Sequence, residues 1–116
     1  MIRKADDREQ EVRQQMRGGR GEITIEHFFR KDEFTANTRL CARLTLPPGS
    51  SIGSHRHESE DEVYIIEQGH GILDDGQSRQ LVSAGDAVLT GNGESHAIAN
   101  DGEDDLVITA VIMCYA

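Results

Sequence analysis

Residues 49–69 read GSSIGSHRHESEDEVYIIEQG, which places two histidines two positions apart directly before an apolar run. On an extended chain, His55 and His57 project from one face about 6.8 Å apart along the strand, so their imidazoles can converge on one ion. A carboxylate would offset part of the ion's charge, and Asp61 or Glu62 can supply it. Strict strand alternation from His57 favours Asp61, whereas a turn within the polar ESED would reset the alternation. The stretch predicts a metal site and leaves its carboxylate open.

The composition is typical of one soluble globular domain. The chain has 116 residues, enough for a single core, and combines 36% hydrophobic with 28% charged residues. Its longest apolar runs are short, and the N-terminal residues do not resemble a secretory signal, so no membrane partner and a cytoplasmic location are expected. Cys41 and Cys114 are far apart and have no C-x-x-C partner, so both are expected to be free thiols.

The first 21 residues differ from the rest of the chain in charge and in residue type. The net charge is −9, yet residues 1–20 carry six basic and four acidic side chains. An acidic body argues against a nucleic-acid partner, because phosphate binding needs a basic face. The segment DDREQEVRQQM is rich in helix formers and ends at RGGRG. We therefore expect residues 1–21 to be a short helical or disordered arm, followed by a β domain over residues 22–116.

Beyond residue 21 the sequence predicts an all-β sandwich or barrel. Short segments rich in Ile, Val, Thr and Leu alternate with turn signals such as PPGS, QGHG and GNGE. In residues 38–46 one alternating set is apolar, which indicates a half-buried strand: Leu40, Ala42, Leu44 and Leu46.

The last strand-like segment is apolar on both of its faces. In residues 106–115 both alternating sets are apolar, so this strand should be covered on both sides. We therefore expect a homodimer whose interface includes Val107, Thr109 or Val111, or the alternating set on the other face if the parity is reversed. Residues 22–29 are a candidate for a strand added to the partner's sheet edge.

Two longer motifs give the sequence its most specific signal. The pattern G-x5-H-x-H-x3,4-E-x6-G is filled by Gly49, His55, His57, Glu62 and Gly69. The pattern G-x5-P-x-G-x2-H-x3-N is filled by Gly85, Gly93, His96 and Asn100, with Gly91 in place of proline. Residues 38–113 therefore resemble a small single-domain cupin with the motif pair of germins and oxalate decarboxylases. The glycine at position 91 predicts a looser turn before His96.

The resemblance implies a double-stranded β-helix, or jelly roll, whose lumen holds a metal. Carried onto this chain, the metal ligands are His55, His57, Glu62 and His96. A mixed nitrogen and oxygen set suits a divalent Mn, Fe, Ni, Co or Zn ion. Four protein ligands leave two positions of an octahedral ion open to a small-molecule ligand or substrate.

The other polar residues near these motifs have simpler readings. Glu58, Glu60 and Asp61 are interpreted as a solvated turn, with Asp61 as the reserve ligand. Tyr64 and His70, together with Asp61, are the only further candidates for a catalytic acid or base. Tyr64 shares a face with Glu62 and is expected in the pocket wall, whereas His70 follows a turn glycine.

Two classes of function remain open. The first is a metal-dependent enzyme acting on a small polar or carboxylate-bearing molecule by oxidation, decarboxylation, isomerisation or elimination. The second is a non-catalytic cupin that binds a metal together with a sugar or a small acid. Two open metal positions favour the enzyme. Arg39 and Arg43 would clamp a carboxylate if they faced the lumen, although charged residues on half-buried strands usually face water.

Overall fold

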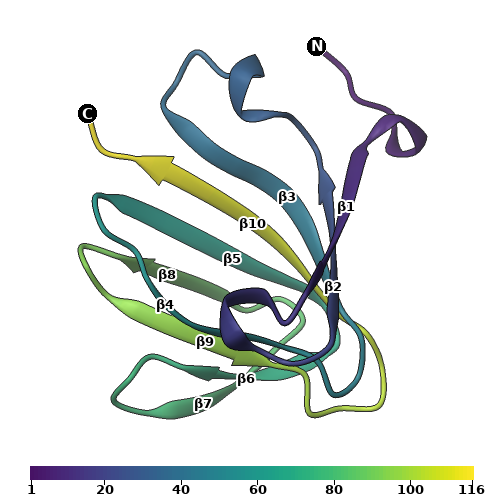
Figure 1. Cartoon of the computed structure of the whole chain (residues 1–116), viewed down its shortest axis with the longest axis vertical. Helices are drawn as coiled ribbons and strands as arrows, with labels where there is room; N and C mark the ends of the chain where they lie inside the picture. Colours follow the sequence, from purple (N-terminus) through teal and green to yellow (C-terminus); the bar gives the residue numbers. More distant parts are fainter.

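The chain folds into two antiparallel β-sheets that face each other (Figure 1). The computed structural model describes residues 1–116. One sheet has six strands in the order β1-β2-β3-β10-β5-β8, and the other has four in the order β4-β9-β6-β7. The expected all-β jelly roll is thereby confirmed. The strands are β1 Glu9–Gln14, β2 Glu22–His27, β3 Thr38–Leu46, β4 Ser51–Arg56, β5 Glu60–Gln68, β6 His70–Asp74, β7 Arg79–Ser83, β8 Ala87–Gly91, β9 Ser95–Ala99 and β10 Leu106–Cys114.

Strand alternation places the core between the two sheets. In β3, Ala42, Leu44 and Leu46 are buried as their alternation predicts. In β10 the buried set is Leu106, Ile108, Ala110 and Ile112. The smaller sheet adds Ile52 from β4 and Ile98 from β9. Each buried leucine or isoleucine contributes about 1.5–3 kcal/mol relative to exposure, so this layer holds the two sheets in place around the lumen.

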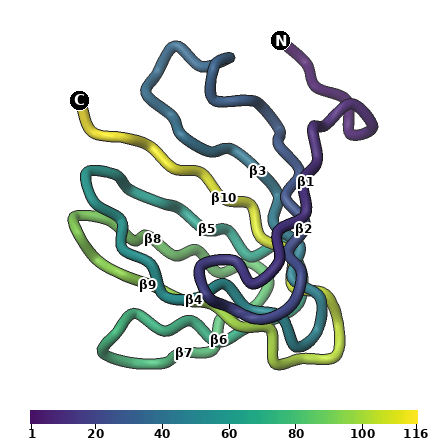
Figure 2. Tube along the Cα trace, in the orientation of Figure 1, coloured from purple at the N-terminus to yellow at the C-terminus, as the bar shows by residue number.

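The N-terminal segment differs from the sequence prediction, because residues 9–14 form strand β1. This strand pairs with β2 along its whole length, from Glu9 opposite His27 to Gln14 opposite Glu22. A helix built from these residues would have almost no apolar face to bury, whereas pairing satisfies the backbone groups at the sheet edge. The tube in Figure 2 shows how this segment crosses the front of the molecule.

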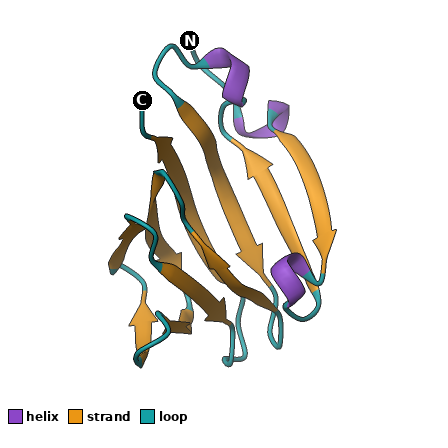
Figure 3. Cartoon of the chain, turned by 60° about the vertical axis from the view of Figure 1, so that its left-hand side comes forward, coloured by secondary structure: helices purple, strands orange, loops and turns teal.

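Helical structure is limited to three short 3₁₀ turns, drawn in purple in Figure 3. They are η1 Ala5–Asp7, η2 Met16–Gly18 and η3 Lys31–Glu33. None of them has the length and apolar character that crossing a membrane requires.

Strand β2 is paired on both of its edges within the chain. It lies between β1 and β3, with Ile25 opposite both Glu11 and Leu44. The expectation that residues 22–29 extend a partner's sheet is therefore wrong for this structure, because β2 has no free edge to offer.

Buried Asn100 explains the last position of the second motif. Its Nδ2 donates to the carbonyl oxygens of Leu46 and Asp104, each at 2.8 Å, and its Oδ1 accepts from the Gly102 N–H at 2.9 Å. A hydrogen bond of this kind contributes about 1 kcal/mol, and leaving its buried partners unpaired costs more. Asn100 thus ties the end of β9 to the loop before β10.

Candidate metal centre

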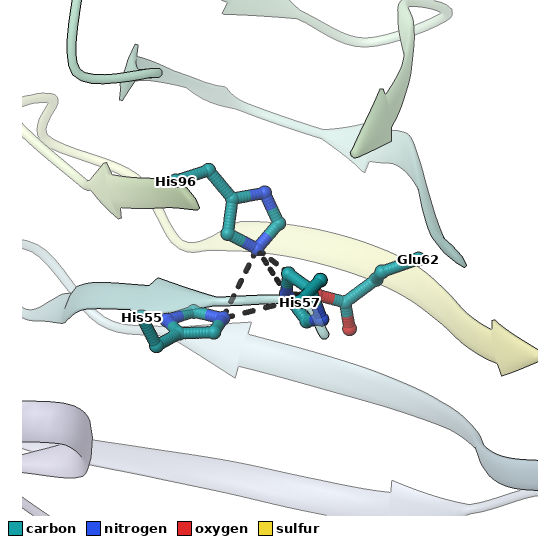
Figure 4. A group of neighbouring side chains, drawn as sticks. All are labelled: His55, His57, Glu62 and His96. Atoms are coloured by element: carbon teal, nitrogen blue, oxygen red, sulfur yellow. Dashed lines mark hydrogen bonds and ion pairs between the residues drawn. The ribbon is translucent and has the colours of Figure 1, made fainter. Parts of the chain in front are cut away.

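Four side chains, three from strands and one from the residue after β4, converge between the two sheets (Figure 4). His55 lies in β4, His57 follows that strand, His96 lies in β9, and Glu62 lies in β5. His55 and His96 are directly opposite each other in the β4–β9 pairing. Their ligand atoms and those of His57 and Glu62 all lie within 4.8 Å of one another. The structure thus brings together the four residues that the resemblance implied.

The spacing of these atoms matches ligands arranged around one ion. Nε2 of His96 lies 3.0 Å from Nε2 of His55, from Nε2 of His57 and from Oε1 of Glu62. Oε1 of Glu62 lies 3.0 Å from Nε2 of His57 and 3.9 Å from Nε2 of His55. Two ligand atoms about 2.1 Å from an ion and at a right angle to each other lie about 3.0 Å apart. The cluster therefore fits a six-coordinate ion better than a tetrahedral one.

The hydrogen bonds on the far side of the His55 and His57 rings direct lone pairs into the cluster. Nδ1 of His55 lies 2.8 Å from the Gly53 carbonyl oxygen, and Nδ1 of His57 lies 2.5 Å from a Glu60 carboxylate oxygen. Both partners can only accept, so each Nδ1 carries the ring proton and each Nε2 presents a lone pair. A single proton on Nε2 of His96 could satisfy only one of the three acceptors facing it. A cation at the centre would satisfy all of them.

Electrostatics favour the metal-binding forms of Glu62 and His96, whereas for His57 the effect of burial is outweighed by the Glu62 and Glu60 carboxylates, which raise its pKa. Burial alone would raise the pKa of Glu62, but the three imidazoles facing its carboxylate lower that pKa well below the usual carboxyl range. Burial also lowers the pKa of His96 and so favours its neutral ring. A carboxylate and neutral imidazoles are the forms that bind divalent metals.

A left-handed turn at Ser59 decides which acidic residue points inward. Ser59 has φ of 57°, and this turn resets the strand alternation between His57 and β5. Glu60, Glu62 and Tyr64 then share the buried face. The alternative ligand Asp61 points away from the cluster and accepts a hydrogen bond from the Tyr115 hydroxyl at 2.6 Å.

Glu60 has a role that the sequence analysis missed. It was interpreted as part of a solvated turn, but it is only 9% exposed and accepts from Nδ1 of His57. Its carboxylate also accepts two hydrogen bonds from Arg39, at 3.0 and 2.8 Å, which lowers its pKa. Arg39 therefore holds Glu60 in place, and Glu60 in turn holds the His57 ring on its side away from the cluster. Hydrogen-bond partners of this kind fix the orientation of a metal-binding histidine. The spacing of three residues from His57 was the only signal in the sequence.

The two arginines of β3 have different surroundings. Arg39 lies at the edge of the cavity beside the cluster, where its guanidinium pairs with Glu60. Arg43 lies near the Phe28 ring, with its guanidinium carbon 6.0 Å from the ring centroid, and does not line that cavity. The register of the β3–β10 pairing shifts between Ile112 and Met113, beside Arg39, whereas the pairing at Arg43 is regular. Arg43 is therefore not placed to clamp a carboxylate there.

The two candidate acid–base residues also lie in different surroundings. Tyr64 is buried and stacks on His96, with ring centroids 4.8 Å apart and planes 17° apart, and burial raises its pKa. It forms part of the wall, as expected. His70 is half-exposed, 3.6 Å from an Asp101 carboxylate oxygen, and does not line the cavity.

Gly91 makes contacts of its own in the turn before His96. Its N–H donates to Oε1 of Glu94 at 3.1 Å, a bond that the usual proline could not make. A Cβ built at Gly91 would lie 1.9 Å from Oδ1 of Asp61, so this glycine also leaves room for that carboxylate. The turn therefore has its own contacts in place of the rigidity of proline.

A small cavity of about 60 Å³ opens beside the cluster. Its lining combines ligand residues with arginines and apolar side chains: Arg13, Met16, Arg17, Ile25, Arg39, Leu40, Leu44, His55, His57, Glu62, Tyr64 and Ile112. Cavities for drug-sized molecules are several times larger, at about 300–1,000 Å³. The space beside the cluster therefore suits a ligand of only a few heavy atoms.

The fold and this cluster define a single-domain cupin, and comparison with known proteins agrees. Residues 42–112 match the family described as "Cupin domain", so the chain belongs to the cupin family. An oxalate-binding protein of Thermotoga maritima is 46% identical over 98 residues, which cover 84% of this chain and 81% of that protein.

Two solved structures show how far the similarity extends. The crystal structure of a predicted oxalate decarboxylase from Thermotoga maritima is 41% identical, with a TM-score of 0.93, and the match covers 98% of this chain and 99% of that one. A cupin domain from Schizosaccharomyces pombe is only 12% identical, with a TM-score of 0.72 over 90% of this chain and 68% of that one. The second similarity shows the shared fold alone.

Replacing His96 by alanine should remove most of the bound metal, because its Nε2 lies 3.0 Å from a ligand atom of each of the other three residues. Elemental analysis of purified protein should show a large drop in metal per chain. Metal at 100 times its Kd should raise wild-type stability by about 2.7 kcal/mol and stabilise the variant far less. His70→Ala is the matched control and should keep wild-type metal content. A stoichiometric metal content in His96→Ala would rule out this ligand set.

Replacing Glu60 by glutamine should weaken metal binding while leaving all four ligand residues present. The change removes the negative charge that faces Nδ1 of His57 and weakens the pairing with Arg39. Loss of such a partner typically costs 10–100-fold in metal affinity, measurable by competition with a chelator. Glu58→Gln is the control, since Glu58 is exposed and pairs only with Arg56. Equal metal affinity in Glu60→Gln and wild type would show that Glu60 does not support metal binding through His57.

Proposed function

We propose that this protein binds a divalent transition metal through His55, His57, Glu62 and His96, and a small carboxylate ligand at the remaining metal positions. The observation that carries the proposal is the convergence of lone pairs from two histidines and a carboxylate on Nε2 of His96. With all three rings neutral, no arrangement of ring protons satisfies all of these groups, whereas one cation does. The nitrogen and oxygen donors fit Mn, Fe, Ni, Co or Zn.

The cavity favours a small anion over a sugar. A volume of about 60 Å³ is too small for a monosaccharide, and three arginines belong to its lining. Guanidinium groups recognise carboxylates through paired hydrogen bonds. A relative at 46% identity is an oxalate-binding protein, so oxalate is the first ligand to test.

The side chains around the cluster have separable roles in this binding. A bound divalent ion supplies Lewis acidity and open positions for oxygen ligands. Glu60 holds the Nδ1 proton of His57, and the Gly53 carbonyl oxygen holds that of His55. Tyr64 covers one face of His96 and excludes water from it. These contacts fix the ligand atoms before a carboxylate arrives, which lowers the ordering cost of binding.

Decarboxylation of the bound acid is the second candidate function. The 41% identical structure is that of a predicted oxalate decarboxylase. For oxalate the reaction would break the carbon–carbon bond, release carbon dioxide and leave formate after uptake of one proton. The cavity lining offers few groups to deliver that proton: Glu62 belongs to the cluster, and burial raises the pKa of Tyr64. Binding without turnover is therefore the better-supported function.

Oxalate should bind the metal-loaded protein and not the metal-free one. Isothermal titration of both forms tests this, because the ligand's oxygens need the open metal positions. Acetate and glucose serve as comparison ligands, and glucose should not bind. Incubation with oxalate, followed by assays for formate and carbon dioxide, separates binding from decarboxylation. Equal oxalate affinity with and without metal would contradict the proposed site.

We further propose a homodimer formed through the outer face of the six-stranded sheet. An apolar row crosses four strands in register on that face: Cys41, Val111, Val63 and Leu89. Leu89 is 68% exposed and Ile65, one row away, is 40% exposed. A continuous apolar row on a sheet face is typical of an interface between subunits. A second copy related by a two-fold axis would cover it.

Light scattering at micromolar concentration should give the mass of a dimer. Leu89→Asp should lower the dimer fraction, because it would bury a charge without a partner. Leu81→Asp is the matched control, since Leu81 is similarly exposed, at 62%, but lies in β7 of the other sheet. A monomer mass for the wild-type protein would exclude this assembly.

A further inference from the structure

The turn that follows β1 lies at the mouth of the cavity beside the cluster. Arg13, near the end of β1, and Arg17, in η2, line that cavity together with His55, His57 and Glu62. The N-terminal segment therefore supplies part of the wall of a site whose metal ligands all come from the barrel.

The backbone of this turn is fixed against β4. The Ser51 N–H donates to the Arg20 carbonyl oxygen at 2.9 Å, and the Arg20 N–H donates to Oγ of Ser51 at 2.9 Å. Two glycines allow the close approach. A Cβ at Gly19 would lie 2.1 Å from the Ser51 carbonyl oxygen, and one at Gly53 would lie 2.1 Å from the Arg17 carbonyl oxygen. The position of Arg17 is thus set by main-chain contacts.

Arg17 adopts a backbone conformation that arginine seldom takes. Its φ and ψ are 55° and 30°, in the left-handed region, and Gln15 before it has φ of 50°. Such conformations carry an energetic cost for residues other than glycine, and they persist where surrounding contacts require them. Glycine would fit this backbone without strain, whereas the arginine carries this cost and contributes to the lining of the cavity.

The charge of Arg17 has no carboxylate partner in the chain. Arg39 pairs with Glu60 and Arg13 pairs with Glu11, whereas no acidic oxygen lies within 4.0 Å of the Arg17 guanidinium. Arg20 and Arg79 also have no carboxylate within 4.0 Å, so the feature that distinguishes Arg17 is its place in the lining of the cavity. An unpaired guanidinium beside a candidate metal centre is suited to the second carboxylate of a ligand whose first carboxylate is held at the metal.

We propose that Arg17 is a specificity-determining residue that selects small dicarboxylates over monocarboxylates. The inference rests on the proposed function, since it requires a carboxylate at the metal. Arg17 binds the far carboxylate of a dianion such as oxalate, and a monocarboxylate offers it no partner. Arg13 adds positive charge to the same wall but is already paired with Glu11.

The test compares four metal-loaded full-length proteins, with equal metal content verified by elemental analysis. These are wild type, Arg17→Gln, Arg17→Lys and Arg79→Gln, titrated with oxalate and with acetate. Arg17→Gln should weaken oxalate binding about 10–100-fold, the range for loss of a charge-assisted pair. Its acetate affinity should stay at the wild-type value. The oxalate affinity of Arg17→Lys should lie between those of wild type and Arg17→Gln, because lysine keeps the charge but lacks the paired N–H donors of the guanidinium.

Arg79→Gln controls for the change in net charge, because Arg79 lies in β7 and does not line the cavity. It should bind oxalate as the wild type does. Unchanged oxalate affinity in Arg17→Gln would overturn the role of Arg17 while leaving the metal-dependent site intact. An equal loss of oxalate and acetate affinity would also overturn it, since selectivity would then be unaffected. Absence of oxalate binding in metal-loaded wild type would instead overturn the proposed function itself.

Discussion

When the three rings are neutral, three acceptors face Nε2 of His96 at 3.0 Å with at most one proton among them, and the contacts around the cluster keep them in this arrangement. Buried lone pairs that face one another are costly unless a cation or a proton lies between them. The surrounding contacts hold this arrangement in place. Glu60 and the Gly53 carbonyl oxygen fix the ring protons on the outer nitrogens, and Tyr64 packs flat on His96. The apolar core then keeps the two sheets at the separation that these contacts need.

The sequence predicted the strands from short-range patterns, and the residues of the cluster from a resemblance. Alternation in residues 38–46 is a property of the strand itself and holds in the structure, whereas the four ligand residues came from the likeness of two motifs to the cupin family. The choice between Asp61 and Glu62 depended on one backbone angle. Alternation alone pointed to Asp61, and the left-handed conformation of Ser59 turned Glu62 inward. A serine at that position gives little indication of such a turn.

Features that depend on tertiary context were not predictable in the same way. Helix-forming residues dominate residues 6–16, yet residues 9–14 form a strand because they pair with the edge of β2 that β3 does not cover. In sequence, Glu60 is one of several neighbouring acidic residues. Its role depends on pairing with Arg39, which is far from it in the chain. Gly91 looked like a weakness in the turn, whereas its N–H and its small size are both used. In each case a distant segment determines the role of a residue whose neighbours in sequence suggest another.

The division of the cluster between the two sheets has a consequence for the dynamics of the barrel. His55 and His96 belong to strands of the smaller sheet and His57 directly follows one of them, whereas Glu62 belongs to the larger sheet. Coordination of one ion by all four residues would therefore cross-link the layers, much as a disulfide does, but reversibly. Sub-global openings that part the layers would become rarer in the loaded protein, and amide hydrogens of β5 and β9 would exchange more slowly. Exchange in β1, at the far edge of the larger sheet, would be largely insensitive to the ion.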